Sequence, residues 1–265
     1  MSIGCATASW ESRVEILGHC DHAQVIALDA PFLPTSNYDW RACERVLTLG
    51  LFQRRCKPGL SHVQGTGRKL REAGLESAKQ LSQVASGCDL AANFPRVWAG
   101  QNIVEAFPNA FLGVLLSGSS FDRMPRLRRG AKFDWLFEEC CATNTIAHVV
   151  NVIGQADLVE ALSRMETNGD HDQRAALVCL LTAASVAVGR YTAIGNQHGG
   201  YFFLPPWDAW ALWAQQEITV QRNRMDSLDV WINGRRFGPE DPLPPAHNTA
   251  LQTDERRTAG QLVAR

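Results

Sequence analysis

The stretch "VIALDAPFLP" (residues 25–34) indicates the fold, because a short apolar run in it ends at an acid followed by Ala-Pro. The segment "QVIALDA" (residues 24–30) contains this run and is expected to form a strand buried on both faces, as in a parallel sheet. Asp29 stands where this strand ends. The acid either makes an Asx-type turn with its own backbone or serves a ligand site at the end of the strand.

Strands and helices alternate along most of the remaining chain, which predicts an α/β layered domain. Extended segments are expected at 13–17 ("RVEIL"), 102–108 ("NIVEAFP") and 200–206 ("GYFFLPP"). Helical spacing of apolar residues marks 38–52, with Asp39 as its cap, then 133–165, 171–189 and the segment that begins at Trp207. Residues 54–71 are expected to form a loop that enters a helix continuing to about residue 84.

The chain has 265 residues, 45% of them hydrophobic, which is enough for one domain with a full core. We expect that domain in residues 1–217 and a poorly ordered tail in 218–265. Residues 238–265 are Pro-rich and then polar, with too little apolar content to fold alone. Truncation after about residue 237 is therefore expected to leave the melting temperature nearly unchanged.

Charge and cysteine usage indicate a soluble cytoplasmic protein without a membrane partner. The formal net charge is −1, so no global field attracts nucleic acid, and any such partner must meet a local basic patch. No apolar run approaches the roughly 18 residues of a membrane helix, and no signal peptide is recognisable. The eight cysteines form no CxxC pair, which favours reduced thiols over a zinc site or a disulfide framework.

Three further acids stand at the borders of apolar segments. Glu105 lies inside "IVEAFP", where a core-facing carboxylate must be paired or bound to a cation, unless it points to solvent instead. Asp170 and Asp172 stand at the start of the apolar helix 171–189, where capping is the commonest role of an acid.

Asp29, Glu105 and an acid at the start of the 171–189 helix are expected to converge at the edge of an open α/β sheet, where ligands usually bind. Clustered carboxylates repel one another, and a hard divalent cation such as Mg²⁺ neutralises them through oxygen ligands. Paired metals activate a water and stabilise the leaving oxygen of a phosphodiester.

The order of several short motifs resembles a known family. "VIALDAPF", "RACERVL", "VEAFPNAFL", "RRGAKFDWLF", "GDHDQRAALVCLLTA" and "GGYFFLPP", spread over residues 24–206, are similar to the family called domain of unknown function 429, a group of predicted nucleases. The resemblance implies a ribonuclease H-like mixed sheet flanked by helices and metal-dependent hydrolysis of phosphodiester bonds. It also implies that Asp29, Glu105 and Asp172 hold Mg²⁺ or Mn²⁺, with Asp170 as a substitute ligand, and that Lys132 contacts a phosphate.

The chain departs from that family at its beginning. Members usually start with a strand that carries an aspartate, whereas "MSIGCATASWESRVEIL" (residues 1–17) contains none. Either this sequence lacks the first strand or the site lacks one ligand. The alternative to a nuclease is therefore a noncatalytic ribonuclease H-like module that binds nucleic acid or acts as a scaffold.

Two basic stretches are candidate contacts for nucleic acid. Residues 54–71 hold six basic side chains and no acid, and a second group comprises Arg123, Arg126, Arg128, Arg129 and Lys132. Local cationic patches of this kind are expected where phosphates dominate binding, although a solvated charged surface gives the same pattern.

Overall fold

The computed structural model describes residues 25–31, 41–56, 66–84, 102–128, 130–166, 169–225 and 227–245. The strand expected at 13–17 and the cap expected at Asp39 lie outside these residues. Among the described residues, no helix combines the length and the apolar character needed to cross a membrane.

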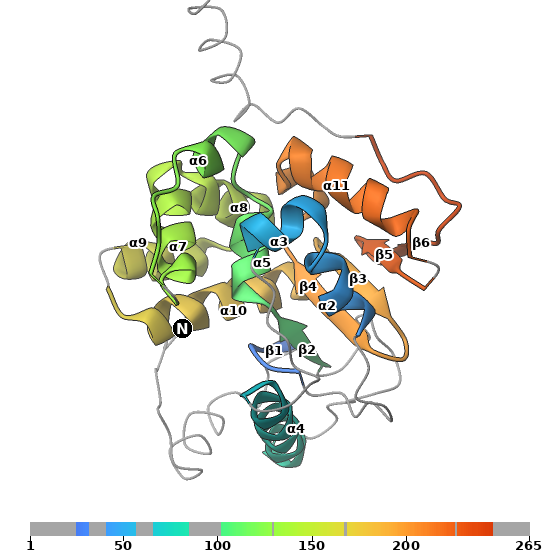
Figure 1. Cartoon of the computed structure of the whole chain (residues 1–265). Helices are drawn as coiled ribbons and strands as arrows, with labels where there is room; N and C mark the ends of the chain where they lie inside the picture. Colours follow the sequence, from blue (N-terminus) through green and yellow to red (C-terminus); the bar gives the residue numbers. More distant parts are fainter. Residues whose placement is uncertain are drawn as a thin grey trace, which may run out of the picture.

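A mixed sheet of six strands forms the centre of the fold, in the order β1-β2-β4-β3-β5-β6 (Figure 1). β1, β2 and β4 run parallel, whereas β3, β5 and β6 join by antiparallel pairing. The strands are β1 Val25–Leu28, β2 Asn102–Ala106, β3 Thr192–Asn196, β4 Gly200–Leu204, β5 Asp229–Ile232 and β6 Arg235–Phe237. The expected α/β class, with a mixed sheet flanked by helices, is thus confirmed.

The two acid-bearing strands form where the sequence predicts them. β1 ends at Leu28, so Asp29 is the first residue after the strand. β2 ends at Ala106, and Pro108 occupies the first turn of the next helix, where its missing N–H is tolerated. The parallel register places Glu105 opposite Leu28.

The helices follow the apolar periodicity of the sequence. Their bounds are α2 Ala42–Leu47, α3 Gly50–Cys56, α4 Thr66–Val84, α5 Pro108–Gly113, α6 Gly118–Asp122, α7 Lys132–Ala142, α8 Thr145–Ile153, α9 Ala156–Glu166, α10 His171–Ala187 and α11 Leu212–Arg222, with a 3₁₀ turn η1 at Trp207–Ala209. α10 packs against β1, β2 and β4, while α2 packs against β3 and β4. Figure 1 shows α4 set apart from the other helices, below the β1 and β2 end of the sheet.

Apolar side chains cover both faces of the sheet. Phe202 and Leu204 of β4 belong to the larger core, together with residues of α2, α5 and α11. Tyr201 and Phe203, which alternate with them, belong to a second cluster that includes Val186 of α10. A strand buried on both faces needs the continuous apolar sequence that 200–204 provides.

The C-terminal part of the chain differs from the expected division at residue 217. That boundary falls inside α11, and β5 and β6 extend the sheet beyond it. Asn233 and Gly234 both have positive φ, 50° and 80°, as a two-residue hairpin turn requires. The segment "DVWI" is short but fully buried, so the domain continues through residues that were expected to form a tail.

Candidate functional site

Arg41 binds Glu105 across the interface between α2 and the sheet. Its Nη1 donates to Oε2 over 2.6 Å, and its Nη2 donates to Oε1 over 2.8 Å. Nη2 also donates to Glu44 Oε1 over 2.9 Å, one turn along α2. Arg41 and Glu105 are each 3% exposed, and Glu44 is 1% exposed. The cation that a buried Glu105 requires is therefore supplied by the protein itself.

The sheet register explains how this ionic group is assembled. Phe202 lies opposite Glu105 in β4, and the Arg41 guanidinium lies 5.3 Å from the centre of its ring. Burial raises the pKa of Glu105 to about 7 against the opposing effect of Arg41, and the nearby Glu44 and Asp29 carboxylates add to the rise. One guanidinium thus neutralises two buried carboxyl groups, which makes proton uptake by one of them easier.

Asp29 lies in the bend that follows β1 and is exposed. Leu28 lies opposite Glu105 in the parallel register, so these two residues share one face of the sheet. Asp29 follows Leu28 by one residue. Surrounding protein atoms raise the pKa of Asp29 to about 6, while His171 opposes the rise. Solvent also reaches Asp29, and this moderates the effect.

The two acids at the start of α10 have different surroundings. Asp170 is the N-cap, and its Oδ1 accepts a hydrogen bond from the backbone N–H of Gln173 over 2.9 Å. Asp172 is exposed in the first turn. Between them, His171 Nδ1 lies 3.1 Å from Asp134 Oδ2. Capping, which was the commoner interpretation of Asp170, is what its oxygen does here.

Among the described residues, no three His, Cys, Asp or Glu side chains are grouped so as to hold a metal ion. The Asp29 carboxylate contributes to the raised pKa of Glu105, and His171 lowers the pKa of Asp29. Asp29 and Asp172 are exposed, whereas both oxygens of Glu105 are occupied by Arg41 and one oxygen of Asp170 by its helix.

Lys132 brings the two basic stretches together. It begins α7, and its Nζ donates to the backbone carbonyl of Arg54 near the end of α3. Arg54, Arg126 and Arg128 are exposed. Arg123 is 63% exposed and pairs with Glu139 over 3.0 Å. This contact places Lys132 of one basic segment against Arg54 of the other, 78 residues earlier in the sequence.

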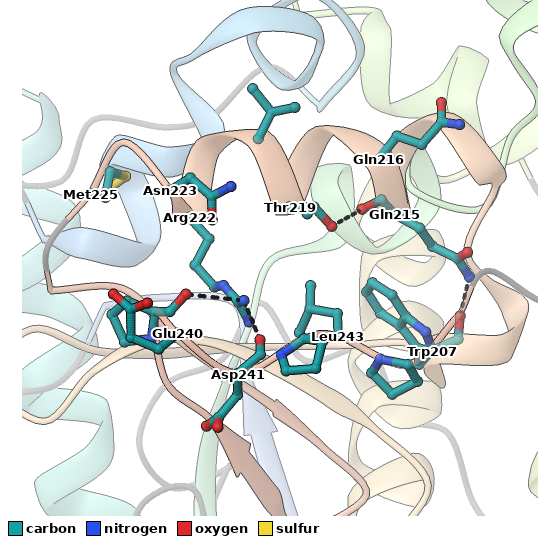
Figure 2. Close-up of a pocket in the computed structure, with 14 residues that line it drawn as sticks. Trp207, Gln215, Gln216, Thr219, Arg222, Asn223, Met225, Glu240, Asp241 and Leu243 are labelled. Carbon is teal, nitrogen blue, oxygen red and sulfur yellow. Dashed lines mark hydrogen bonds between the residues drawn. The ribbon is translucent and has the colours of Figure 1, made fainter.

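A groove of about 860 Å³ lies elsewhere, between α11 and the segment 239–244, and contains none of the predicted site residues. Figure 2 shows Arg222 reaching from α11 toward this segment, where its Nη2 donates to the carbonyl oxygens of Pro239, over 3.2 Å, and Asp241. Burial lowers the pKa of Arg222. These bonds attach residues 239–241 to the folded domain.

Comparison of the chain with protein-family models, curated proteins and solved structures yields no match.

One arginine in these sites, Arg41, was not among the residues predicted from sequence. Arg41 lies in "RACERVL" with Glu44 three residues later, and both stand among the buried Ala42, Cys43 and Val46. Charged residues within such an apolar pattern are a signal that a partner is required.

Proposed function

We propose that this chain is a noncatalytic nucleic-acid-binding module of the ribonuclease H-like type. The observation that supports the proposal is the contact between Lys132 and the Arg54 carbonyl, which brings together one residue from each basic segment. Binding to the phosphate backbone accounts for such a patch in a chain whose overall net charge is only −1.

The noncatalytic part of the proposal rests on the Arg41–Glu105 pair. A buried carboxylate attracts a divalent cation most strongly where no protein cation already neutralises it. Both Glu105 oxygens instead accept hydrogen bonds from Arg41, within 2.6 and 2.8 Å. The buried pair stabilises the packing of α2 on the sheet, and breaking it would leave an unpaired charge in the core.

Fluorescence anisotropy with a labelled oligonucleotide of about 20 nucleotides, titrated at several salt concentrations, tests nucleic-acid binding. The double substitution R126S/R128S is expected to weaken binding and to reduce the salt slope by about 0.7–0.9 for each phosphate that the variant no longer neutralises. The control R224S/R235S removes the same charge from exposed positions elsewhere. Equal effects of the two double variants, or no binding by the wild type, would refute the proposal.

A metal-dependent nuclease is the second candidate, and the position of Asp29 favours it. Asp29 is exposed at the end of β1, next to β2, and interacts electrostatically with Glu105 and His171. Asp29 and Asp172 would then hold Mg²⁺ or Mn²⁺, with Asp170 and Glu105 contributing after they leave their present partners. Lys132 would adjoin the phosphate.

Thermal unfolding with millimolar Mg²⁺ or Mn²⁺, together with a hydrolysis assay on labelled RNA, DNA and hybrid strands, separates the candidates. The nuclease predicts a metal-induced rise in melting temperature that Asp29→Asn abolishes. The noncatalytic module predicts binding of the strands without cleavage and without a rise that depends on Asp29.

A further inference from the structure

The outer side of α11 exposes two large apolar side chains. Leu212 is 38% exposed and Val220 is 44% exposed, although the opposite side of the helix is buried in the core through Trp213 and Ile218. Gln216 is also exposed and lies between the two, at spacings of four residues. Side chains four residues apart form one ridge on a helix, so Leu212, Gln216 and Val220 make a single row.

The charged neighbours of this row are turned toward their own molecule. Glu217 follows Gln216 in sequence, but its carboxylate lies against Gly50 of α3 and accepts a hydrogen bond from Gln221 over 2.5 Å. Arg222 is directed to the carbonyl of Pro239. The row therefore presents one neutral amide between two apolar side chains, a composition that favours burial against another apolar surface.

The row borders the groove between α11 and the segment 239–244. Gln216, Val220 and Leu243 are among the residues that line this groove, whose volume is about 860 Å³. Figure 2 shows the segment passing alongside α11. The segment contains three prolines, Pro239, Pro242 and Pro244. Prolines lack the N–H that would pair with an added strand, so an occupant of the groove must bind through its side chains.

The row is symmetrical about its centre. Gln216 lies four residues after Leu212 and four residues before Val220. When two such helices pack antiparallel across a twofold axis at Gln216, Leu212 of each copy meets Val220 of the other. The two Gln216 side chains then meet at the axis, where each offers an amide donor and an acceptor to the other. Self-complementarity of this kind is what a twofold contact between identical chains requires.

The charges near the ends of α11 suit the same arrangement. The N-cap is Ala211, which has no polar side chain, and the first turn contains no acid. Glu240 and Asp241 are exposed near the other end of the helix, where Arg222 holds their segment. Antiparallel packing brings these acids toward the N-terminus of α11 of the second copy, which attracts negative charge. A net charge of −1 leaves little overall repulsion between two copies.

We propose that α11 docks on α11 of a second copy of this chain, and that the protein forms a twofold dimer through the row and the adjoining groove. Because α11 has only 11 residues, the interface lies at the small end of stable ones, which bury roughly 800 Å² per partner. A dissociation constant on the order of 10 µM is therefore expected.

Sedimentation velocity of the full chain at about 1–100 µM tests the dimer. We expect the wild type to shift from monomer to dimer over this range. Leu212→Glu and Val220→Glu each place a charge on the row and should leave the protein monomeric at the highest concentration. The matched controls are Leu70→Glu on α4 and Val159→Glu on α9, because the same residue types there are 50% and 54% exposed. Both controls should dimerise as the wild type does.

Gln216→Cys tests the position of the axis. Two thiols that meet at a twofold axis are close enough for a disulfide, so mild oxidation should link this variant into a covalent dimer. Val159→Cys should stay at the wild-type background. A wild type that is monomeric throughout, or dimerisation unchanged in both row variants, would overturn the dimer. Dimerisation lost in the row variants without cross-linking of Gln216→Cys would overturn the antiparallel packing. Neither result bears on nucleic-acid binding, so the proposed function is tested separately.

Discussion

The substitution Arg41→Leu would leave the buried Glu105 and Glu44 carboxyl groups without the guanidinium that bridges them. Near pH 6 Glu105 is mostly protonated, because its pKa is about 7, and the cost is mainly the loss of charged hydrogen bonds. Such bonds contribute about 1–3 kcal/mol in total here. Solvent does not screen this interaction appreciably, because the Arg41 and Glu105 side chains are only 2% and 4% exposed.

The cost should grow with pH, because burial without Arg41 raises the pKa of Glu105 further. Above pH 7 the folded variant then retains a proton that the unfolded chain, with a pKa near 4.5, has lost. The free energy of unfolding of the variant falls by about 1.36 kcal/mol per pH unit in this range, relative to the wild type. Near pH 8.5 the total reaches about 3–5 kcal/mol, which is the usual cost of breaking a buried ion pair.

Urea unfolding followed by circular dichroism at pH 6, 7 and 8.5 measures this dependence. Arg68→Leu is the control, because Arg68 pairs with Glu72 across side chains that are 59% and 66% exposed, and its cost should stay below about 0.5 kcal/mol at every pH. The double variant R41L/E105Q should lose most of the growth with pH, since glutamine does not ionise. A cost of Arg41→Leu that is independent of pH, or below about 1 kcal/mol at pH 8.5, would refute the reasoning.

Two more predictions concern Asp29 and the C-terminal segment. The pKa of Asp29 is raised from 3.8 to about 6, so the folded wild type binds its proton more readily than the unfolded chain, and stability is lost as pH rises through this window. The stability of Asp29→Asn relative to the wild type should therefore increase as pH rises from 3.8 to about 6 and stay constant above that range. Urea midpoints of the two proteins that differ by the same amount at every pH would contradict this. Truncation after Phe237 removes the Pro239 and Asp241 carbonyls that accept hydrogen bonds from the buried Arg222, and should lower the free energy of unfolding by about 1–3 kcal/mol. Truncation after residue 245 retains both carbonyls and is the control. Equal melting temperatures of the two truncated proteins would show that these bonds do not stabilise the fold.

Local sequence patterns predicted the strands and helices near the acids. The apolar run 25–28, the stop at Pro108 and the acid before the 171–189 helix all act within a few residues, and β1, α5 and the Asp170 cap follow from them. The "NG" pair at Asn233 and Gly234 is an equally local signal, because both residues adopt the positive φ of a hairpin turn readily. That pair, rather than the polar composition after it, indicates that the domain extends past residue 217.

Contacts between distant segments could not be predicted in this way. Arg41 and Glu105 are 64 residues apart, and Arg54 and Lys132 are 78 apart. A buried acid indicates that a cation is needed, but its sequence neighbourhood does not say whether a metal or an arginine supplies it. The choice depends on where α2 packs on the sheet, which is a property of the whole core.

The Arg41–Glu105 pair also determines how a metal could enter. A cation that takes Glu105 as a ligand would either lie beside the Arg41 guanidinium, which repels it, or displace Arg41 from one acidic partner, at a cost of about 3–5 kcal/mol. That cost weakens metal binding by about 10²- to 10⁴-fold relative to a site that leaves the pair intact. Any Mg²⁺ bound at millimolar concentration should therefore use the exposed Asp29 without Glu105, and a metal-induced rise in melting temperature should survive Glu105→Gln while disappearing in Asp29→Asn. Loss of the rise in Glu105→Gln would mean instead that Arg41 yields its partner to the metal, and the noncatalytic interpretation of the pair would be wrong.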